Sequence, residues 1–205
     1  MVVLRGMILA VRKLASNWLN LVINLGRKDV RIESNEVSRG AKIGGGTEIK
    51  TGTAVDGQSI IGPHVYIGKY CNITRAEVGS YSSIANGVSI GQGEHDLYRV
   101  STNSIFYERP YDELTKEDIF IEEDVWIGAD SLILRGVVVG RGAVIGANSV
   151  VTKSIPRYAV AVGSPARVIK YRFQKDRIDS IENSKWWENS PAVAKLIIER
   201  IDRDA

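Results

Sequence analysis

Histidine is the side chain best suited to proton transfer near neutral pH, and this 205-residue sequence contains two, His64 and His95. His95 stands between Glu94 and Asp96, and an imidazole in such a place could act as a general base. It could equally cap the end of a structural element or pair with one of the two carboxylates. His64 follows Pro63 inside a regular repeat, where we expect a surface or corner residue.

The other residue types exclude several kinds of chemistry. Cys71 is the single cysteine, so neither an internal disulfide nor a cysteine-rich zinc site can form. Two histidines are too few for a three-histidine zinc centre, and we expect no metal. The unpaired cysteine fits a reducing compartment such as the cytoplasm, and we predict a thiol buried in the core. The net charge of +3 gives no sign of the basic face that nucleic-acid binding requires.

A repeat of six residues organises most of the chain. Aliphatic residues recur every six positions from Val37 to Ile73, resume over residues 78–90 and recur from Ile121 to Val151. Six is a multiple of the two-residue period of a strand and not of the 3.6-residue turn of a helix, so these side chains share one side of an extended chain. Short strands joined by tight corners and stacked in coils satisfy this pattern. A sandwich of alternating strands is the alternative, but its turns rarely keep one fixed spacing.

The segment DVWIGADSLILRGVVVGRGAVIGANSVVTKSIPRYAVAVGSPARVIKYRF, residues 124–173, closely resembles the hexapeptide-repeat acyltransferases. The resemblance covers about residues 37–173 and implies an all-β solenoid, the left-handed parallel β-helix. The left hand comes from the resemblance, because the period of six does not fix it. The resemblance also implies an enzyme that uses acetyl-CoA as co-substrate, and a homotrimer with active sites between subunits.

Between the two arrays, residues 96–118 lose the period and form a long loop, a feature that is usually functional within a compact repeat. The stretch IGQGEHDLYRVSTNSIFY, residues 90–107, resembles the xenobiotic and polysaccharide O-acetyltransferase branch, in which the histidine matching His95 is the general base. The sequence does not identify the group that orients this imidazole. The side chains expected to shape the acceptor pocket are Tyr98, Ser101, Thr102, Phe106 and Tyr107.

The same resemblance implies a coenzyme A groove along one edge of the prism. Carried over residue by residue, it implies contacts from Trp126, Ala129, Ala147, Thr152, Lys153, Arg167 and Lys170. Trp126 would lie beside the pantetheine arm and Ala129 near the thioester. Arg167 and Lys170 would meet the phosphates, which cations bind well; a solvated basic surface is the alternative. Lys170 stands where relatives often have arginine.

The N-terminal segment, residues 1–36, is apolar but interrupted by Arg5, Arg12 and Lys13, and no window in it supplies the roughly 20 apolar residues of a spanning helix. We expect an amphipathic helix that packs on the body or on a partner subunit. Contact with an anionic membrane surface is the alternative, and it would place the protein at the inner face of the membrane.

The C-terminal extension, residues 174–205, is also expected to be helical. Ser190 as N-cap and Pro191 at the first helical position predict the start of a helix. The side chains expected on one face of it are Val193, Leu196, Ile197 and Ile201. We expect this face to pack on the β-helix domain, residues 37–173, or on a sister chain.

The sequence therefore predicts an acetyltransferase that moves acetyl from acetyl-CoA to a hydroxyl of a sugar or polysaccharide precursor. Three alternatives stay open. The acceptor hydroxyl could belong to an antibiotic such as a streptogramin or chloramphenicol, or the acceptor could be the amine of a nucleotide-linked sugar. A hexapeptide-repeat scaffold without activity is the non-enzymatic alternative, because a fold does not imply a function.

Overall fold

In the computed structural model the described residues are 29–203, together with the single positions 7, 10, 11, 14, 15, 18, 19, 22 and 26. Most of the N-terminal segment predicted as helix therefore lies outside the described residues. Among the residues that are described, no helix is long and apolar enough to cross a membrane.

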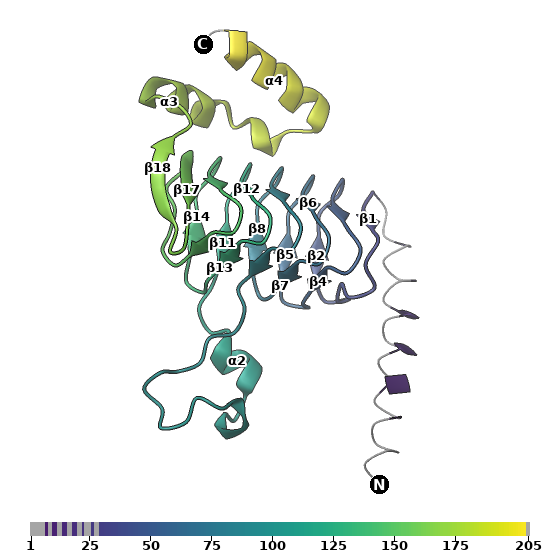
Figure 1. Cartoon of the computed structure of the whole chain (residues 1–205). Coiled ribbons are helices and arrows are strands. Elements are labelled where there is room, and N and C mark those ends of the chain that lie inside the picture. The colour runs from purple at the N-terminus through teal and green to yellow at the C-terminus, as the bar shows by residue number, and fades with distance from the viewer. Residues whose placement is uncertain are drawn as a thin grey trace.

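Short parallel strands build a solenoid with three faces (Figure 1). Sheet A contains β1 (Arg31–Ile32), β3 (Glu48–Ile49), β6 (Tyr66–Ile67), β9 (Ser83–Ile84), β12 (Trp126–Ile127), β15 (Val144–Ile145), β17 (Ala159–Val162) and β18 (Arg167–Tyr171). Sheet B contains β4 (Ala54–Val55), β7 (Asn72–Ile73), β10 (Ser89–Ile90), β13 (Leu132–Ile133) and β16 (Val150–Val151). Sheet C contains β2 (Lys42–Ile43), β5 (Ile60–Ile61), β8 (Glu77–Val78), β11 (Phe120–Ile121) and β14 (Val138–Val139). Pairing is parallel except between β17 and β18, whose antiparallel pairing ends sheet A.

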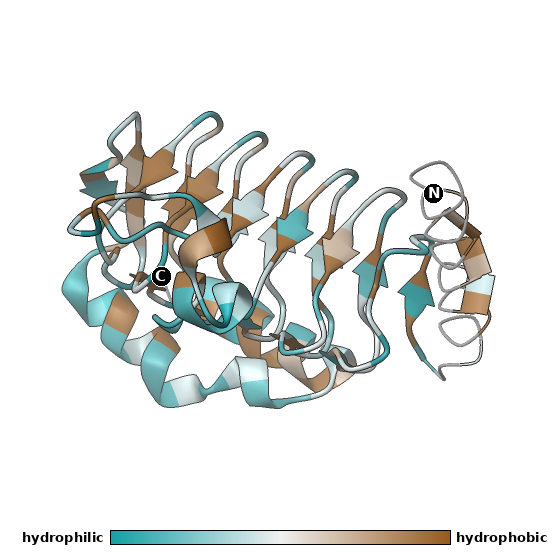
Figure 2. Ribbon diagram, turned by 90° about the horizontal axis from the view of Figure 1, so that it is seen from below, coloured by the Kyte–Doolittle hydropathy of each residue, from teal (hydrophilic) through white to brown (hydrophobic). Residues whose placement is uncertain are grey.

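The aliphatic residue at every sixth position points into the solenoid. In sheet A, Ile67 pairs with Ile49 on one side and with Ile84 on the other, and all three are fully buried. Full burial of such a side chain stabilises by about 1.5–3 kcal/mol, so stability comes from the stack of coils and not from any one coil. Figure 2 shows the coils in a row, with the short strands of successive coils side by side along the solenoid. The predicted β-helix of hexapeptide repeats is confirmed, and so is the buried thiol of Cys71.

Corners of the coils align in three edges, which we name after the sheets that they join. The A–B edge includes Ala129 and Ala147, and the C–A edge includes His64 and Tyr81. The B–C edge is where the long loop leaves the solenoid, between β10 and β11. His64 is a corner residue, as predicted, with a φ of 58° and its ring stacked on that of Tyr81 at 4.9 Å between centroids.

The solenoid begins earlier than the sequence pattern indicates. Strand β1 (Arg31–Ile32) pairs with β3, although the expected start of the repeat was residue 37. The stretch around β1 lacks the glycines and small corner residues of later hexads, so the repeat does not reveal it. The coil forms because β3 offers a partner for its backbone.

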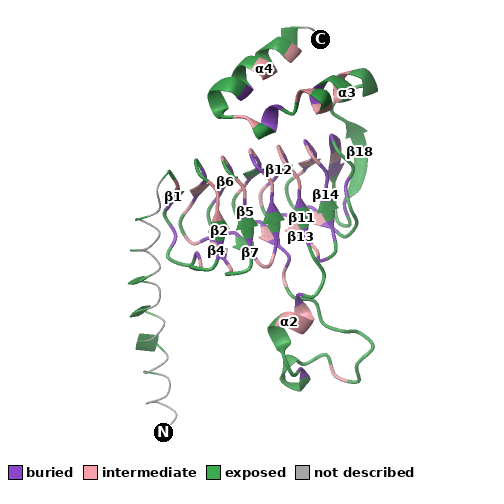
Figure 3. Cartoon of the chain, turned by 180° about the vertical axis from the view of Figure 1, so that it is seen from behind, coloured by how far each residue is buried: buried purple, intermediate pink, exposed green. Residues whose placement is uncertain are grey.

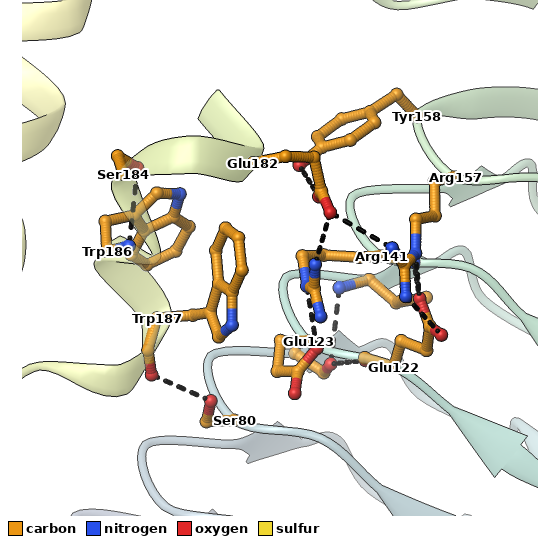
Figure 4. A network of polar contacts seen from close by, with 12 residues as sticks. Ser80, Glu122, Glu123, Arg141, Arg157, Tyr158, Glu182, Ser184, Trp186 and Trp187 are labelled. Atoms are coloured by element: carbon orange, nitrogen blue, oxygen red, sulfur yellow. Dashed lines mark hydrogen bonds and ion pairs between the residues drawn. The ribbon is translucent and has the colours of Figure 1, made fainter. Parts of the chain in front are cut away.

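The C-terminal extension covers the C–A edge with α3 (Lys175–Ser184), η2 (Trp186–Glu188) and α4 (Pro191–Arg203). We call these three elements the C-terminal cap. Trp186 packs on the ring of Tyr81, and the hydroxyl of Ser80 donates to the carbonyl of Trp187 (Figure 4). In Figure 1 the cap and the long loop lie on different sides of the solenoid. The cap therefore leaves the B–C edge free for the loop.

Helix α4 begins at Pro191, as the sequence predicts, but the predicted buried face was partly wrong. Ala194 is buried, and Ile197, Ile198 and Ile201 pack against the same cluster. Val193 and Leu196 are exposed. Helix α4 is rotated so that the small side chain of Ala194 faces Trp186 and Trp187 of η2, and its small size lets the two backbones approach closely.

Candidate active site

The long loop occupies residues 91–119 between the last strand residue of β10 and the first of β11. It contains η1 (Ser104–Phe106) and α2 (Pro110–Leu114) and is exposed over most of its length (Figure 3). Because a solenoid has straight walls, a loop that leaves it can form a hollow beside its own base. A cavity of about 250 Å³ lies at its base. Its lining residues are Glu94, His95, Asp96, Leu97, Tyr98, Glu113, Leu114, Lys116, Glu117 and Arg135.

The imidazole of His95 is oriented by a backbone carbonyl within the loop. Its Nδ1 hydrogen-bonds to the carbonyl oxygen of Thr102. A carbonyl can only accept, so Nδ1 carries the proton and Nε2 of the neutral ring has the free lone pair. His95 is exposed and lines the cavity. This is the arrangement that a general base requires, and neither neighbouring carboxylate, Glu94 or Asp96, provides it.

A small cluster inside the loop holds the segment around Thr102 against His95. The hydroxyl of Tyr107 accepts a hydrogen bond from the backbone N–H of Asp96 at 2.9 Å, and its ring lies edge-on to that of His95. The guanidinium of Arg99 stacks on the Tyr107 ring at 4.1 Å and pairs with Glu113 at 2.9 Å. The loop is thus folded on itself around Tyr107, next to the ring of His95.

The side chains predicted for the acceptor pocket are placed in different ways. Tyr98 is fully exposed and lines the cavity beside His95. Tyr107 is buried inside the loop, so its position suits support of the loop more than contact with an acceptor. Ser101 accepts a hydrogen bond from the N–H of Asn103, and Phe106 is exposed on η1. Thr102 acts through its carbonyl.

Three of the seven residues predicted for coenzyme A, Trp126, Arg167 and Lys170, lie together on the outer face of sheet A. Trp126 pairs with Val144, Val144 with Val160, and Val160 with Lys170, so the four residues form one row across the strands. A register shift in β18 puts Arg167 opposite Val162, on the same outward face as Lys170. The row from Trp126 to Lys170 spans three strand spacings, or about 14 Å.

The A–B edge runs beside this row and is lined by small residues. Asn148 donates its N–H to the carbonyl of Ala129 at 2.8 Å, which stacks Ala129 and Ala147 in successive coils. Ala129 is half-buried and Ala147 is exposed. Side chains this small leave the backbone groups of the corner accessible to a ligand.

Thr152 and Lys153 are not brought to this face. They follow β16 of sheet B and are exposed at the B–C edge, the edge from which the loop carrying His95 emerges. Sheet B separates the two edges by one hexad, or about 20 Å of extended chain. A single chain therefore holds its histidine and its row of small and basic residues on different edges.

The sequence did not reveal three features of this site. They are the Thr102 carbonyl that binds His95, the Arg135 side chain beneath the loop, and the hydrogen bond from the Tyr111 hydroxyl to Asp56. A backbone carbonyl has no sequence signal. Arg135 occupies a corner position of its hexad, where residues of every type occur, and Asp56 and Tyr111 are far apart in the chain. Only the folded coils bring these groups together.

Comparison with known proteins supports the repeat. Residues 118–153 match the family model described as bacterial transferase hexapeptide (six repeats). The region that matches includes β11 to β16, the coils that follow the loop. The chain thus contains hexapeptide repeats of the kind found in bacterial transferases.

Solved structures share the fold at low sequence identity. The chain resembles AntD, an N-acyltransferase from Bacillus cereus solved with dTDP-4-amino-4,6-dideoxyglucose and coenzyme A, with a TM-score of 0.60 and 24% identity over 76% of this chain and 83% of that one. It also resembles the acetyltransferase domain of PglB from Neisseria gonorrhoeae FA1090, solved with acetyl coenzyme A, with a TM-score of 0.51 and 19% identity over 70% of this chain and 56% of that one. These similarities establish a common fold.

Proposed function

We propose that the protein is an acetyltransferase that moves the acetyl group of acetyl-CoA to a hydroxyl of a sugar or polysaccharide precursor, with His95 as general base. The observation that carries this proposal is the hydrogen bond from His95 Nδ1 to the Thr102 carbonyl, beside a cavity at the base of the loop. It leaves Nε2 as the basic nitrogen, with the acceptor bound in the cavity next to Tyr98.

The reaction needs no covalent enzyme intermediate. His95 Nε2 removes the proton of the acceptor hydroxyl as its oxygen attacks the thioester carbonyl, and the new C–O bond forms. The C–S bond then breaks, and the imidazolium returns the proton to the sulfur of coenzyme A. A positioned base of this kind contributes about 10²–10⁴-fold to the rate. The buried Cys71 has no part in the reaction, because burial raises the pKa of its thiol and keeps it protonated.

Acetyl-CoA would lie along the A–B edge and the outer face of sheet A. The indole of Trp126 is half-exposed and would flank the pantetheine arm, with Ala129 and Ala147 leaving room for the thioester end. Arg167 and Lys170 share an outward face and would meet the phosphates as charge-assisted donors. The same ligand is bound by the fold relatives AntD and PglB, as coenzyme A and acetyl coenzyme A respectively.

We further propose that the active site lies between subunits of a homotrimer. His95 emerges at the B–C edge, whereas Ala129 and Ala147 lie on the A–B edge of the same chain, about 20 Å away, and Trp126 lies on sheet A. A closed ring of subunits can bring the B–C edge of one chain to the A–B edge of the next. Thr152 and Lys153 would then join the site from the subunit that provides His95.

Transfer to an amine is the second candidate, favoured by the fold shared with AntD, an N-acyltransferase solved with a nucleotide-linked amino sugar. A histidine base serves both reactions, so its geometry does not separate them. Free sugars, nucleotide amino sugars and antibiotics offered in parallel, with release of free thiol as the readout, decide between a hydroxyl and an amine acceptor. A protein that releases no thiol with any acceptor would contradict the acetyltransferase proposal.

The role of His95 is tested with the other histidine as a matched control. His95→Asn should lower kcat by about 10²–10⁴-fold, because asparagine cannot accept the proton. His64→Asn should keep normal turnover, since asparagine tolerates the positive φ of this corner. Normal turnover of His95→Asn would show that another group is the base.

The shared site is tested by mixing two inactive variants. His95→Asn removes the base, and Ala147→Trp blocks the groove at the A–B edge. When the two chains are co-expressed and assemble at random, a site between subunits takes His95 from the Ala147→Trp chain and the open groove from the His95→Asn chain in about a quarter of cases. We expect about a quarter of normal activity. No recovered activity in assemblies shown to contain both chains would place the whole site within one chain.

A further inference from the structure

The coils lose one corner where the loop leaves the solenoid. At an ordinary corner a turn amide donates to the carbonyl of the corner below, as Gly87 does to Lys69 and Asp130 to Asn86. On the B–C edge the corner above Thr74 and Arg75 is replaced by the loop. The carbonyl of Arg75, which stands in the position of Lys69 and Asn86, therefore lacks the usual donor from the next coil.

Arg135, from the coil beyond the loop, fills this gap. One of its terminal nitrogens, Nη2, donates to the carbonyls of Thr74 and Gly91. The other, Nη1, donates to the carbonyl of Arg75 at 3.0 Å and to that of Glu117 at 2.9 Å. Gly91 and Glu117 stand at the two ends of the loop, so one guanidinium ties both ends to the coils on either side.

This guanidinium is buried, and it forms no ion pair with any residue that the structure describes. Arg135 is only 7% exposed, its Nε has no hydrogen-bond partner in the described part of the chain, and burial lowers the pKa of its guanidinium. A buried cation is expensive unless its surroundings satisfy it. The planar fork of arginine can donate to four carbonyls at once, which the ammonium of a lysine cannot do with the same geometry.

Arg135 is connected to the catalytic histidine through one residue. Its backbone N–H donates to the carboxylate of Glu94 at 3.1 Å, and the N–H of Glu94 donates to the carbonyl of Leu114 at 2.9 Å. Glu94 directly precedes His95. The guanidinium of Arg135 therefore holds the ends of the loop, and the backbone of the same residue holds Glu94, the residue before His95.

A second contact ties the far part of the loop to the solenoid. The hydroxyl of Tyr111, in α2, donates to the carboxylate of Asp56 in an earlier coil of the B–C edge. Burial and this hydrogen bond raise the pKa of Tyr111 to about 12, so the phenol stays protonated as a donor. Asp56 is held in turn by Ser59 and by the N–H of Arg75.

We propose that Arg135 is a positioning residue that sets the placement of His95, with the Tyr111–Asp56 hydrogen bond as a second anchor of the same loop. The proposal rests on the proposed function, in which His95 is the base. In this proposal the coils beneath the loop determine where His95 lies, because the loop itself is exposed over most of its length.

The test compares Arg135→Met and Arg135→Lys with Arg109→Met, an exposed loop arginine whose side chain pairs only with Asp112 in the described structure. We expect both Arg135 variants to lose about 100-fold in kcat per folded protein, as a displacement of about 1 Å does. The Kd for coenzyme A should stay within twofold, because Trp126, Arg167 and Lys170 lie on sheet A and the contacts of the Arg135 guanidinium are confined to the B–C edge. Arg109→Met should keep its kcat. An unchanged kcat in Arg135→Met, measured below its melting temperature, would overturn the proposal.

Milder variants cover the case in which Arg135→Met does not fold. Tyr111→Phe and Asp56→Asn each remove the second anchor, and the double variant should lower kcat no further than either single change. Additive losses would show that the two residues do not act through their mutual hydrogen bond.

Amide hydrogen exchange separates failure of this proposal from failure of the proposed function. Exchange over residues 91–119 should speed up in Arg135→Met and not in Arg109→Met, whether or not the protein transfers acetyl groups. Unchanged exchange would overturn the anchoring itself. A wild-type protein without thiol release, but with the expected exchange, would instead reject the acetyltransferase reaction.

Discussion

Glu182 joins the C-terminal cap to the solenoid, and its removal gives a stability prediction that can be worked from distances (Figure 4). Its carboxylate accepts hydrogen bonds from Tyr158 at 2.6 Å, from Arg141 at 2.7 Å and from Arg157 at 3.0 Å. Glutamine in its place keeps the volume but loses the charge, and its amide N–H₂ would face donors. Glu182→Gln should therefore weaken the cap without opening a cavity.

The size of the effect follows from how exposed each partner is. Arg141 is 13% exposed and also stacks on Trp187 at 3.8 Å, so its bond to Glu182 is sheltered and is expected to contribute about 1.5 kcal/mol. Arg157 is 47% exposed, and solvent screens its pair to about 0.5 kcal/mol. The sum is about 2 kcal/mol, which for a chain of this size lowers the melting temperature by about 4–8 °C.

Thermal unfolding followed by tryptophan fluorescence measures this change, because Trp186 and Trp187 are buried in the cap whereas Trp126 is exposed on sheet A. Glu188→Gln, an exposed residue of the same cap, is the matched control and should shift the melting temperature by less than about 2 °C. If Glu182→Gln behaves like Glu188→Gln, the network does not hold the cap.

Three further predictions concern pH, reactivity and packing. The hydrogen bonds from Arg157 lower the pKa of Glu122. Burial raises the pKa of Glu182, but the hydrogen bonds from Tyr158 and Arg141 outweigh it and lower that pKa as well. Both carboxylates therefore stabilise the fold at pH values above their ordinary pKa of 4.5, and melting curves should show this stability lost as the pH falls through the lowered pKa values. A thiol reagent should leave Cys71 unmodified in the native protein, because burial raises its pKa, and should react with one equivalent in denaturant; fast native reaction would refute its burial. In chemical denaturation, Ile127→Ala should lower the free energy of unfolding by about 3–4 kcal/mol because Ile127 is buried, and Leu196→Ala should lower it by less than about 0.5 kcal/mol because Leu196 is exposed. Equal losses would rule out the observed packing.

Much of the fold follows from local sequence. The six-residue period placed the inward side chains of the coils, from Ile49 to Val151, because each hexad repeats the same strand and corner. Pro191 marked the start of α4 in the same way, since the first turn of a helix tolerates proline. The loss of the period over residues 96–118 indicated the loop, which in the structure spans residues 91–119.

The tertiary structure decided what these elements meet. The buried face of α4 could not be predicted from the spacing of its apolar residues, because Val193 and Ile197 are both apolar. Only the position of α4 against α3 and η2 determines that Ile197 is covered and Val193 is not. Tyr107 was expected at the acceptor, yet the loop folds around it. These choices depend on contacts between segments far apart in the chain, which a local pattern does not contain.

The sequence by itself determined that the chain stacks in coils, that a loop interrupts them and that His95 stands at its start. The structure decided that the Thr102 carbonyl orients the imidazole, that Arg135 ties both ends of the loop, and that His95 and Ala129 occupy different edges. The physical reason is that coil formation depends on a repeated short-range pattern. Placement of the histidine depends instead on single hydrogen bonds to backbone carbonyls, which exist only after the coils have stacked.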